Sequence, residues 1–248
     1  MVQQNEAESD WVAPDTLPDL SSAKRIAIDL ETKDPNLTTS GPGWATGDGY
    51  VTGFAIATDK WSGYLPIRHE GGGNLDTGLV KRWLNKTLSS RCDKIFHNAL
   101  YDVGWLKRED IQLNGKIHDT VIAAPLVNEN RRRYSLNVLG ADYCGDIKDE
   151  TLLREAAQSY DVDPKSEMWR LPAKYVGEYA EQDAVLTLKL WDKLSKQLEK
   201  ENLQSIYELE SNLIPLLIEM RWRGVRVDVN KAEQSVDELK KQEQECIK

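Results

Sequence analysis

The chain has 248 residues, 40% of them hydrophobic, and a formal net charge of −9 at pH 7. This length allows one full domain with a small annex. No apolar run reaches membrane-spanning length, and the first residues lack the basic and apolar regions of a secretory signal. Cys92, Cys144 and Cys246 show no metal-ligand spacing, so we expect reduced thiols and assign them no metal.

The apolar patterning predicts an α/β domain with a mixed sheet. Residues 1–20 are acidic and contain two prolines, which favours a flexible leader. Strands are expected at 25–31, 51–58, 61–66 and 94–97, with a short fifth strand near Ile117. Helices are expected at 77–88, 100–108, 119–128, 135–142, 150–158, 172–197, 203–222 and 230–248.

The first expected strand ends in two acidic residues. Because alternate side chains share one face of a strand, Ile26, Ile28 and Leu30 should point into a core. Asp29 and Glu31 should point together to the opposite face, where their charges repel each other. A divalent cation such as Mg²⁺ or Mn²⁺ would neutralise them, since it prefers hard oxygen ligands. Taken alone, the same pattern is also typical of a strand end whose acids meet solvent.

Two more carboxylates occur in helical settings. Asn98 and Asp102 are four residues apart and should share a helical face, and so should Tyr179 and Asp183. Each pattern by itself is also typical of a solvated Asp or an amphipathic Tyr. An apolar stripe runs beside the second pair, formed by Ala180, Ala184, Leu188 and Trp191.

In this order, the motifs Asp-x-Glu, Asn-x-x-x-Asp and Tyr-x-x-x-Asp resemble the three exonuclease motifs of the DEDD family, tyrosine subclass. The resemblance is closest to the 3′–5′ proofreading domain of family A DNA polymerases, which include bacterial polymerase I and many phage replicases. It covers roughly residues 21–198, and His118-Asp119-Thr120 is similar to a short segment of that family. The resemblance implies a ribonuclease H-like fold, a mixed sheet flanked by helices, with a mostly helical C-terminal extension.

The resemblance also implies a mechanism, hydrolysis of the 3′-terminal phosphodiester of DNA with two divalent cations, Mg²⁺ or Mn²⁺. Asp29, Glu31 and Asp183 would hold the first metal, and the Tyr179 hydroxyl would orient the attacking water. Asp29 would bridge to the second metal, which Asp102 would support directly or through water. The product would be a nucleoside 5′-monophosphate.

Residues 208–228 resemble the start of the polymerase module of family A enzymes. Gly224 is expected as a left-handed C-cap, Val225 and Val227 as a short strand, and Asn230 as the cap of the last helix. We therefore expect residues 199–248 to begin a polymerase module and the chain to be an amino-terminal fragment of a longer polymerase, without polymerase activity of its own. A naturally shortened nuclease is the alternative.

The long connection 33–50 follows Asp-x-Glu directly and should border the substrate groove. Leu37, Trp44 and Tyr50 are candidates to stack on or wedge between terminal bases, and Tyr134 and Trp169 are weaker ones. The acidic net charge does not exclude DNA binding, since a frayed end needs few phosphate contacts. Arg170 and Lys174 are possible contacts, as is the set proposed to bind substrate: Thr32, Leu37, His97, Asn98, Arg131, Arg132 and Arg133.

His97 and Asn98 would position Asp102 or the substrate, although a purely structural role is equally compatible with the sequence. The expected partners are single-stranded or frayed 3′ DNA ends and the polymerase module of the same longer chain, with no membrane. The expected location is the cytoplasm of a bacterial cell or of a phage-infected host.

Three alternatives remain. An RNase D-like exoribonuclease would share all four acids, but it would be expected to continue into a small helical RNA-binding domain. A catalytically inactive scaffold of a polymerase would commonly have lost the acids. A metabolic metal-dependent enzyme is the least favoured, because no motif suggests a small-molecule cofactor.

Overall fold

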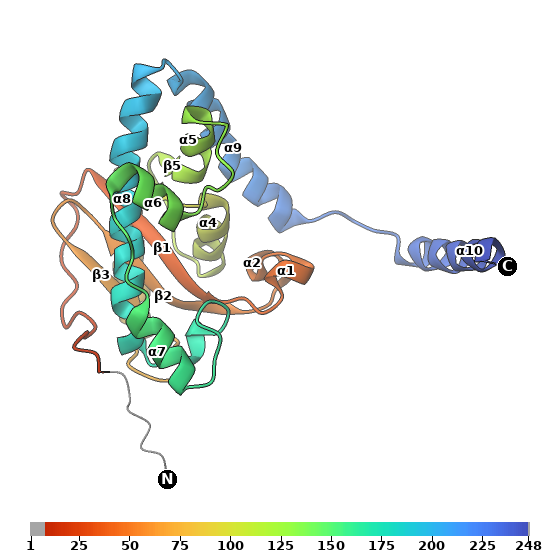
Figure 1. Cartoon of the computed structure of the whole chain (residues 1–248), viewed down its shortest axis with the longest axis horizontal. Helices are drawn as coiled ribbons and strands as arrows, with labels where there is room; N and C mark the ends of the chain where they lie inside the picture. Colours follow the sequence, from red (N-terminus) through yellow and green to blue (C-terminus); the bar gives the residue numbers. More distant parts are fainter. Residues whose placement is uncertain (1–7, 248) are drawn as a thin grey trace, which may run out of the picture.

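A computed structural model describes residues 8–247 of the chain. This range contains five strands and ten α-helices, with only helices after the last strand, and two short 3-10 helices, η1 and η2, precede the longest helix (Figure 1). The strands are β1 (Arg25–Lys33), β2 (Tyr50–Ala57), β3 (Ser62–Pro66), β4 (Asp93–Phe96) and β5 (Ile117–Asp119). The helices are α1 (Leu37–Ser40), α2 (Gly43–Thr46), α3 (Thr77–Leu88), α4 (Ala99–Arg108), α5 (Thr120–Val127), α6 (Leu136–Cys144), α7 (Thr151–Ser159), η1 (Met168–Arg170), η2 (Ala173–Tyr175), α8 (Gly177–Lys200), α9 (Gln204–Arg223) and α10 (Val229–Ile247).

The five strands form one sheet in the order β3-β2-β1-β4-β5. The pairs β1–β2 and β2–β3 are antiparallel, whereas β1–β4 and β4–β5 are parallel. The sheet is therefore mixed and β1 is central, which confirms the expected fold class. The register of β1 against β2 shifts between Glu31 and Thr32. Such a bulge turns the end of a strand and is frequent beside active sites.

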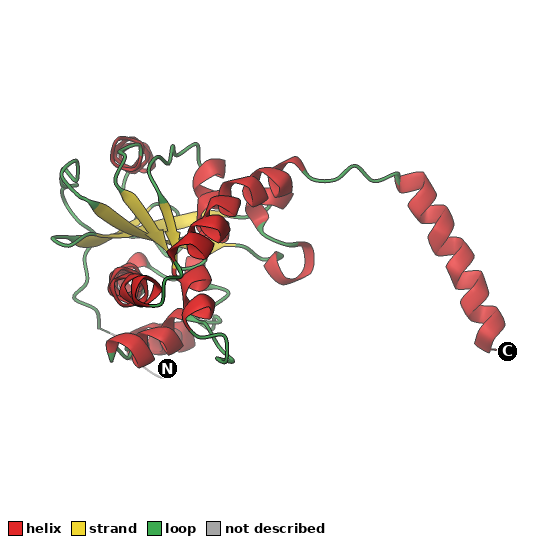
Figure 2. Cartoon of the chain, turned by 90° about the horizontal axis from the view of Figure 1, so that it is seen from above, coloured by secondary structure: helices red, strands yellow, loops and turns green. Residues whose placement is uncertain are grey.

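The two faces of β1 separate as the alternation predicts. Ile26, Ile28 and Leu30 belong to a core shared with α3, α4 and α9. Ala27 faces a second core, built against α7 and α8. Figure 2 shows the strands enclosed between helices on both sides. Asp29 and Glu31 therefore lie on the face that α8 covers.

The segment 8–20, expected as part of a flexible leader, packs on the domain. Trp11 donates its indole N–H to Glu181 Oε1 at 2.8 Å and lies against the ring of Tyr64. Pro18 accepts a hydrogen bond from the indole of Trp83 at 2.7 Å. These contacts fix the segment, because aromatic burial with a satisfied indole N–H outweighs the local preference of acidic residues for water. Residues 1–7 of the expected leader lie outside the described residues.

The connection between β1 and β2 differs from the expected irregular loop, since it contains the short helices α1 and α2. Its Trp44 was a candidate for base stacking, and this prediction is wrong. The Trp44 side chain is fully buried, lies directly against Gly104 of α4 and stacks on Trp222 of α9. A side chain larger than hydrogen at position 104 would occupy the space of this indole ring.

The C-terminal part departs from expectation in three details. Gly224 ends α9 with φ +68° and ψ −173°, so it is not the left-handed cap that the sequence predicted, and residues 225–227 form no strand. Asp228, and not Asn230, accepts the hydrogen bond from the Lys231 N–H that caps α10. Figures 1 and 2 both show α10 standing apart from the domain, and its residues are exposed.

Helix α9 packs through only one of its faces. Tyr207, Ser211, Ile214 and Ile218 are buried against the domain. The leucine stripe that marks this helix in the sequence is exposed, so the spacing predicted the helix and not the buried face. The exposed apolar residues of α9 are Ile206, Leu209, Leu213, Leu216, Leu217, Met220 and Trp222.

Candidate active site

Three carboxylates meet at the end of β1. Asp29 and Glu31 come from this strand and Asp183 from α8, and one carboxylate oxygen of each lies within 4.8 Å of the others. The strand periodicity aims the first two at α8, and the helix supplies the third from the face that packs on the sheet. The sequence motifs predicted this group, and the structure brings it together.

Asp102 stands beside this group on α4. It is 4% exposed, and its negative charge raises the pKa of Asp29. It does not belong to the set of oxygens within 4.8 Å of one another, which is formed by the other three acids among the described residues. The expected role of Asp102 at a second metal ion, directly or through water, stays a prediction.

Burial and mutual repulsion raise the pKa values of the acids in this site. Burial and the charge of Asp183 raise the pKa of Glu31 to about 8. The pKa of Asp29 is raised well above its ordinary value, first by burial and then by Asp183, Asp102 and Glu31. Burial also raises the pKa of Asp102, with further contributions from Asp119 and Glu31. Like charges gathered in a buried place disfavour ionisation until a cation joins them.

Tyr179 lies one helical turn before Asp183 on α8 and belongs to the same site. Burial raises the pKa of the phenol, and the charges of Asp183, Glu31 and Asp29 raise it further. The Tyr179 hydroxyl therefore stays protonated and acts as a hydrogen-bond donor. It helps to hold the pKa of Asp183 down, although burial raises that pKa overall.

Lys148 is a residue of the site that the sequence reasoning missed. It lies in the loop between α6 and α7, and its ammonium forms an ion pair with Asp183 Oδ1. The same ammonium lies 4.4 Å from the centre of the Tyr179 ring. A lysine in a loop belongs to no helical or strand periodicity that would predict its position. Its sequence neighbours Asp146, Asp149 and Glu150 are charged, so the segment resembles a solvated loop.

The start of α4 is shaped by Asp119, the residue that follows the β5 histidine. Asn98 adopts φ +81° and precedes the helix as its N-cap, so the expectation that Asn98 and Asp102 share a helical face is wrong. The backbone N–H groups of Asn98 and Ala99 donate to the Asp119 carboxylate at 3.0 and 2.8 Å. Asn98, in the left-handed conformation and bound to the Asp119 carboxylate, makes the sharp turn that begins α4 and so positions Asp102 at the site.

Asp119 is itself fixed from α9. Its backbone N–H donates to the Tyr207 hydroxyl at 3.0 Å. Tyr207 and Trp191 also enclose the His118 ring, whose centre is 4.3 Å from that of Trp191. The resemblance singled out His118-Asp119-Thr120, and in the structure these residues support the site from behind.

His97 lies next to the site but is bound to a neighbouring helix. Its Nδ1 shares a hydrogen bond of 2.7 Å with the Thr120 hydroxyl. Burial and the nearby charge of Lys148 lower its pKa to about 4, so the imidazole is neutral at physiological pH. The structure thus shows a structural role for His97, and its proposed contact with substrate stays a prediction.

A groove of about 450 Å³ opens beside Glu31. Leu37, which is 42% exposed, stands over it from α1. Other residues proposed to bind substrate, Thr32 and Asn98, also line it. A volume of this size accommodates a small ligand such as one nucleotide.

Hydrogen bonds hold the walls of this groove together. The hydroxyls of Thr32 and Tyr101 are 2.7 Å apart, and Tyr101 donates to Asp34 Oδ2 at 2.9 Å. Asp34 in turn accepts from the Gly43 N–H at the start of α2. The chain thus ties the end of β1, helix α4 and the segment that carries Leu37 into one unit.

The other side chains proposed to contact DNA do not line this groove. Arg131 forms an ion pair with Asp142, and none of the residues 131–133 lines the groove beside Leu37. Lys33 lies between two aromatic candidates, 3.7 Å from the ring centre of Trp169 and 5.4 Å from that of Tyr50. Arg170 pairs with Glu167. Their contacts with DNA remain predictions.

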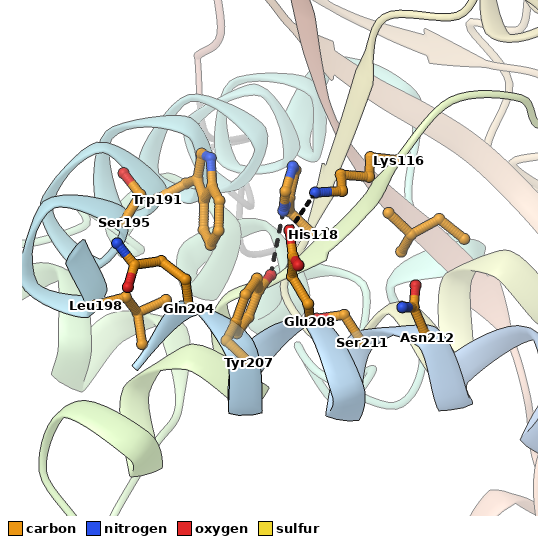
Figure 3. A pocket seen from close by; sticks show the side chains of 11 residues that line it. Lys116, His118, Trp191, Ser195, Leu198, Gln204, Tyr207, Glu208, Ser211 and Asn212 are labelled. Carbon is orange, nitrogen blue, oxygen red and sulfur yellow. Dashed lines mark hydrogen bonds and ion pairs between the residues drawn. The ribbon is translucent and has the colours of Figure 1, made fainter. Parts of the chain in front are cut away.

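A smaller pocket of about 140 Å³ lies behind the site, between β5, α8 and α9. Figure 3 shows the rings of Trp191, His118 and Tyr207 side by side in it, with the Tyr207 hydroxyl directed at His118. Asp29, Glu31, Asp102 and Asp183 do not line this pocket. Its aromatic wall is the packing that fixes Asp119, and through Asp119 the start of α4.

The acid group fits a divalent cation. Three carboxylates offer hard oxygen ligands within a small sphere, which suits Mg²⁺ or Mn²⁺. Their raised pKa values are the expected consequence of anionic ligands grouped around a place for positive charge.

Among residues 8–247, no helix combines the length and apolar character that crossing a lipid bilayer requires.

Comparison with solved structures supports the fold. The chain is similar to Brucella melitensis NrnC with bound Mg²⁺, with a TM-score of 0.57, 21% identity, and coverage of 86% of this chain and 94% of that one. It is also similar to the polymerase domain of Pol1 from M. smegmatis, with a TM-score of 0.64, 20% identity, and coverage of 90% of this chain and 32% of that one.

Curated relatives are longer than this chain. A DNA-directed DNA polymerase of Pseudomonas phage M6 is 43% identical over 232 residues, which are 90% of this chain and 35% of the relative. DNA polymerase I of Synechocystis is 28% identical over 178 residues, 66% of this chain and 16% of the relative. The chain thus spans about a third or less of the length of these relatives. Residues 2–199 match the sequence model of the 3′–5′ exonuclease domain of family A DNA polymerases, and the chain belongs to this family.

Proposed function

We propose that this 3′–5′ exonuclease removes nucleotides from the 3′ end of DNA with the help of two Mg²⁺ or Mn²⁺ ions, as the proofreading part of a longer family A DNA polymerase. The observation that carries the proposal is the meeting of Asp29, Glu31 and Asp183, within 4.8 Å, beside the Tyr179 phenol. A nuclease that cleaves an unactivated phosphodiester needs such a place for metal ions.

In this proposal, Asp29, Glu31 and Asp183 would hold one cation, and Asp29 and Asp102 would hold the other. When bound, the two cations would lower the pKa of a water molecule and stabilise the charge that develops on the leaving oxygen. The burial of the ligands supports the assignment. Each of Glu31, Asp102 and Asp183 is less than 9% exposed, so water screens their charges only weakly.

The protein groups orient the reaction. The Tyr179 hydroxyl donates a hydrogen bond that aims the water at phosphorus. The water oxygen forms the new bond to phosphorus, the bond to the 3′ oxygen of the preceding nucleotide breaks, and a proton ends on that oxygen. The products are a nucleoside 5′-monophosphate and a DNA strand shortened by one residue.

The groove beside Glu31 would hold the terminal nucleotide. Leu37 is exposed over it and would wedge against the last base, while Thr32 and Asn98, which line the groove, would border the sugar and phosphate. Stacking on an apolar side chain tolerates any base. A paired end must first unstack, so single-stranded and mispaired ends should react faster.

The named relatives support DNA as the substrate and a polymerase as the larger context, since they are phage and bacterial DNA polymerases. We assign residues 21–198 to the exonuclease domain and residues 199–248 to the beginning of a polymerase module, and we place the action of the protein in the bacterial or phage-infected cytoplasm. The exposed apolar face of α9 is compatible with a following module.

The test uses a 5′-labelled DNA and an RNA of equal sequence, each incubated with the protein with and without Mg²⁺. The proposal expects a ladder of DNA shortened from the 3′ end that disappears in chelator. The Asp29→Ala variant should lose this cleavage. Asp59→Ala is its matched control, because Asp59 is an exposed acid that pairs with Arg25 away from the site. Degradation in chelator, preference for RNA, or shortening from the 5′ end would overturn the proposal.

A further inference from the structure

The acidic site contains a buried lysine that the mechanism above does not use. The Lys148 side chain is 4% exposed, in the loop between α6 and α7. Lysines are almost never buried to this extent unless they are paired. Here the partner is Asp183, one of the carboxylates proposed to hold a metal.

The position of the ammonium is specific. It contacts Asp183 Oδ1 on one side and lies 4.4 Å from the ring centre of Tyr179 on another. These two residues would hold the metal and orient the water. Lys148 therefore lies where the phosphate and the attacking water are expected to meet.

The loop that carries Lys148 is braced at both ends. Before it, Asp146 forms an ion pair with Lys189 of α8 at 2.6 Å. After it, Glu150 accepts a hydrogen bond from the Asn137 side chain of α6 at 3.0 Å. The two braces keep the backbone of the loop over the site, so the long lysine side chain can change partner without the loop leaving.

The charge of Lys148 reaches the whole acid group. Burial raises the pKa values of Asp29, Glu31 and Asp183, and Lys148 opposes this rise at each of them. Lys148 pairs with only one of the three acids, so the oxygens of Asp29 and Glu31 remain free to accept a cation. The site can therefore attract a divalent cation, which must then compete with Lys148 for Asp183.

We propose that Lys148 exchanges partners during the reaction: it neutralises Asp183 in the free enzyme, and it donates to a non-bridging oxygen of the scissile phosphate when the 3′ end is bound. This inference rests on the proposed function. A divalent cation and an ammonium repel each other at one carboxylate oxygen. Displaced from Asp183 but held by its loop, Lys148 meets the phosphate as its next anionic acceptor, a contact that lysine commonly makes as a point charge.

The exchange predicts two opposite effects of one substitution. Lys148→Met keeps the apolar stem and removes the charge. Without DNA, Mn²⁺ should bind at least about tenfold more tightly to this variant, because no ammonium competes for Asp183. With DNA and saturating Mn²⁺, KM for a short single-stranded oligonucleotide should rise about tenfold, because a charged hydrogen bond to the phosphate is lost.

The experiment measures Mn²⁺ affinity by calorimetry without DNA, and KM and kcat with (dT)₈. Lys116→Met is the matched control, since Lys116 forms an exposed ion pair with Glu208 at 2.6 Å, outside the acid group. Lys148→Arg should return both Mn²⁺ affinity and KM toward the wild-type values. Lys148→Gln repeats the test if the Met variant does not fold, which its unfolding midpoint will show.

A merely structural lysine would give a different result. Loss of Lys148 would then lower the unfolding midpoint and weaken Mn²⁺ binding, and that outcome overturns the exchange. Unchanged Mn²⁺ affinity or unchanged KM in Lys148→Met also overturns it. If the wild-type protein binds no Mn²⁺ or leaves DNA intact, the proposed function has failed, which is a result distinct from failure of the Lys148 exchange.

Discussion

Glu31 and Glu109 are buried to nearly the same extent, with exposed fractions of 8% and 7%, yet the pKa values of their carboxyl groups are shifted in opposite directions. The pKa of Glu31 is raised to about 8, first by burial and then by Asp183. Burial also acts to raise the pKa of Glu109, but hydrogen bonds from Arg68 and Lys81 bring it below its ordinary value. The difference lies in the partners and not in the burial.

The comparison separates two uses of a buried carboxylate. Glu109 receives both guanidinium N–H groups of Arg68, at 2.6 and 2.8 Å, and the Lys81 ammonium at 3.0 Å. Its charge is matched, and it joins the β3–α3 connection, α3 and α4. Glu31 has other acids as close neighbours, and one shared lysine does not prevent the rise of its pKa. An unmatched group of this kind marks a functional site, because folding alone would select against it.

The largest expected effect lies in the unmatched group. Asp29→Ala should reduce DNA cleavage by at least about 10³-fold, because Asp29 is the proposed bridge between the two cations. Binding of DNA should persist or strengthen, since a negative charge near phosphate is removed. Single-turnover cleavage and fluorescence anisotropy measure the two properties. Cleavage within tenfold of wild type would show that another carboxylate is the bridge.

Tyr179→Phe should have a smaller effect on the same site. The phenol orients water without holding a metal, so its loss should raise the barrier by about 1–3 kcal/mol, roughly 5- to 150-fold in kcat. The variant should bind Mn²⁺ as the wild-type protein does. A loss as complete as that of Asp183→Ala would give Tyr179 more than an orienting role, and an unchanged kcat would remove it from the mechanism.

A change in the group formed by Glu109, Arg68 and Lys81 should affect the stability of the protein and not its activity. Glu109→Gln leaves Arg68 and Lys81 without their counter-charge, and it should lower the free energy of unfolding by about 1–3 kcal/mol. Because the pKa of Glu109 is lowered in the folded state, its contribution is present above the ordinary value of 4.5 and is lost as pH falls through the folded value. Urea unfolding at pH 7 and pH 3 tests this. Altered kcat in a fully folded Glu109→Gln protein would argue against the division into two groups.

For the acid group around Glu31, stability should follow a pH trend of opposite sign. In chelator, the folded state holds the Glu31 proton more tightly than the unfolded chain does. Stability should therefore fall as pH rises from 4.5, the ordinary value, through about 8, the folded value. Glu31→Gln should flatten this decline, and so should saturating Mg²⁺. Equal slopes for wild type and Glu31→Gln in chelator would contradict the assigned pKa shift.

The resemblance to the DEDD exonuclease motifs singled out the acid group, and local periodicity predicted which faces its members share. The alternation in β1 assigns Ile28 and Asp29 to opposite faces, and helical spacing assigns Tyr179 and Asp183 to one face. Both assignments depend only on neighbouring residues, and the structure agrees with them.

The unpredicted parts all depend on contacts between distant segments. Trp44 is buried because Gly104 leaves room for its ring. Lys148 enters the site because its loop is braced by α6 and α8. The pairing of Glu109 with Arg68 joins residues far apart in sequence and leaves no spacing to read. The leucines of α9 show the same limit, since their spacing predicts a helix but not which face the domain covers.

The most direct test of the central claim, that the unmatched acids form a cation site, is calorimetric titration of Mn²⁺ at pH 7 in two buffers of different ionisation enthalpy. This measurement counts the protons released on binding. The account predicts that wild type and Glu109→Gln bind Mn²⁺ alike and release protons, because the metal must displace the protons that the raised pKa values of Asp29 and Glu31 favour. Asp29→Ala should bind far more weakly. Equal Mn²⁺ binding by Asp29→Ala, or binding by wild type without proton release, would contradict the account.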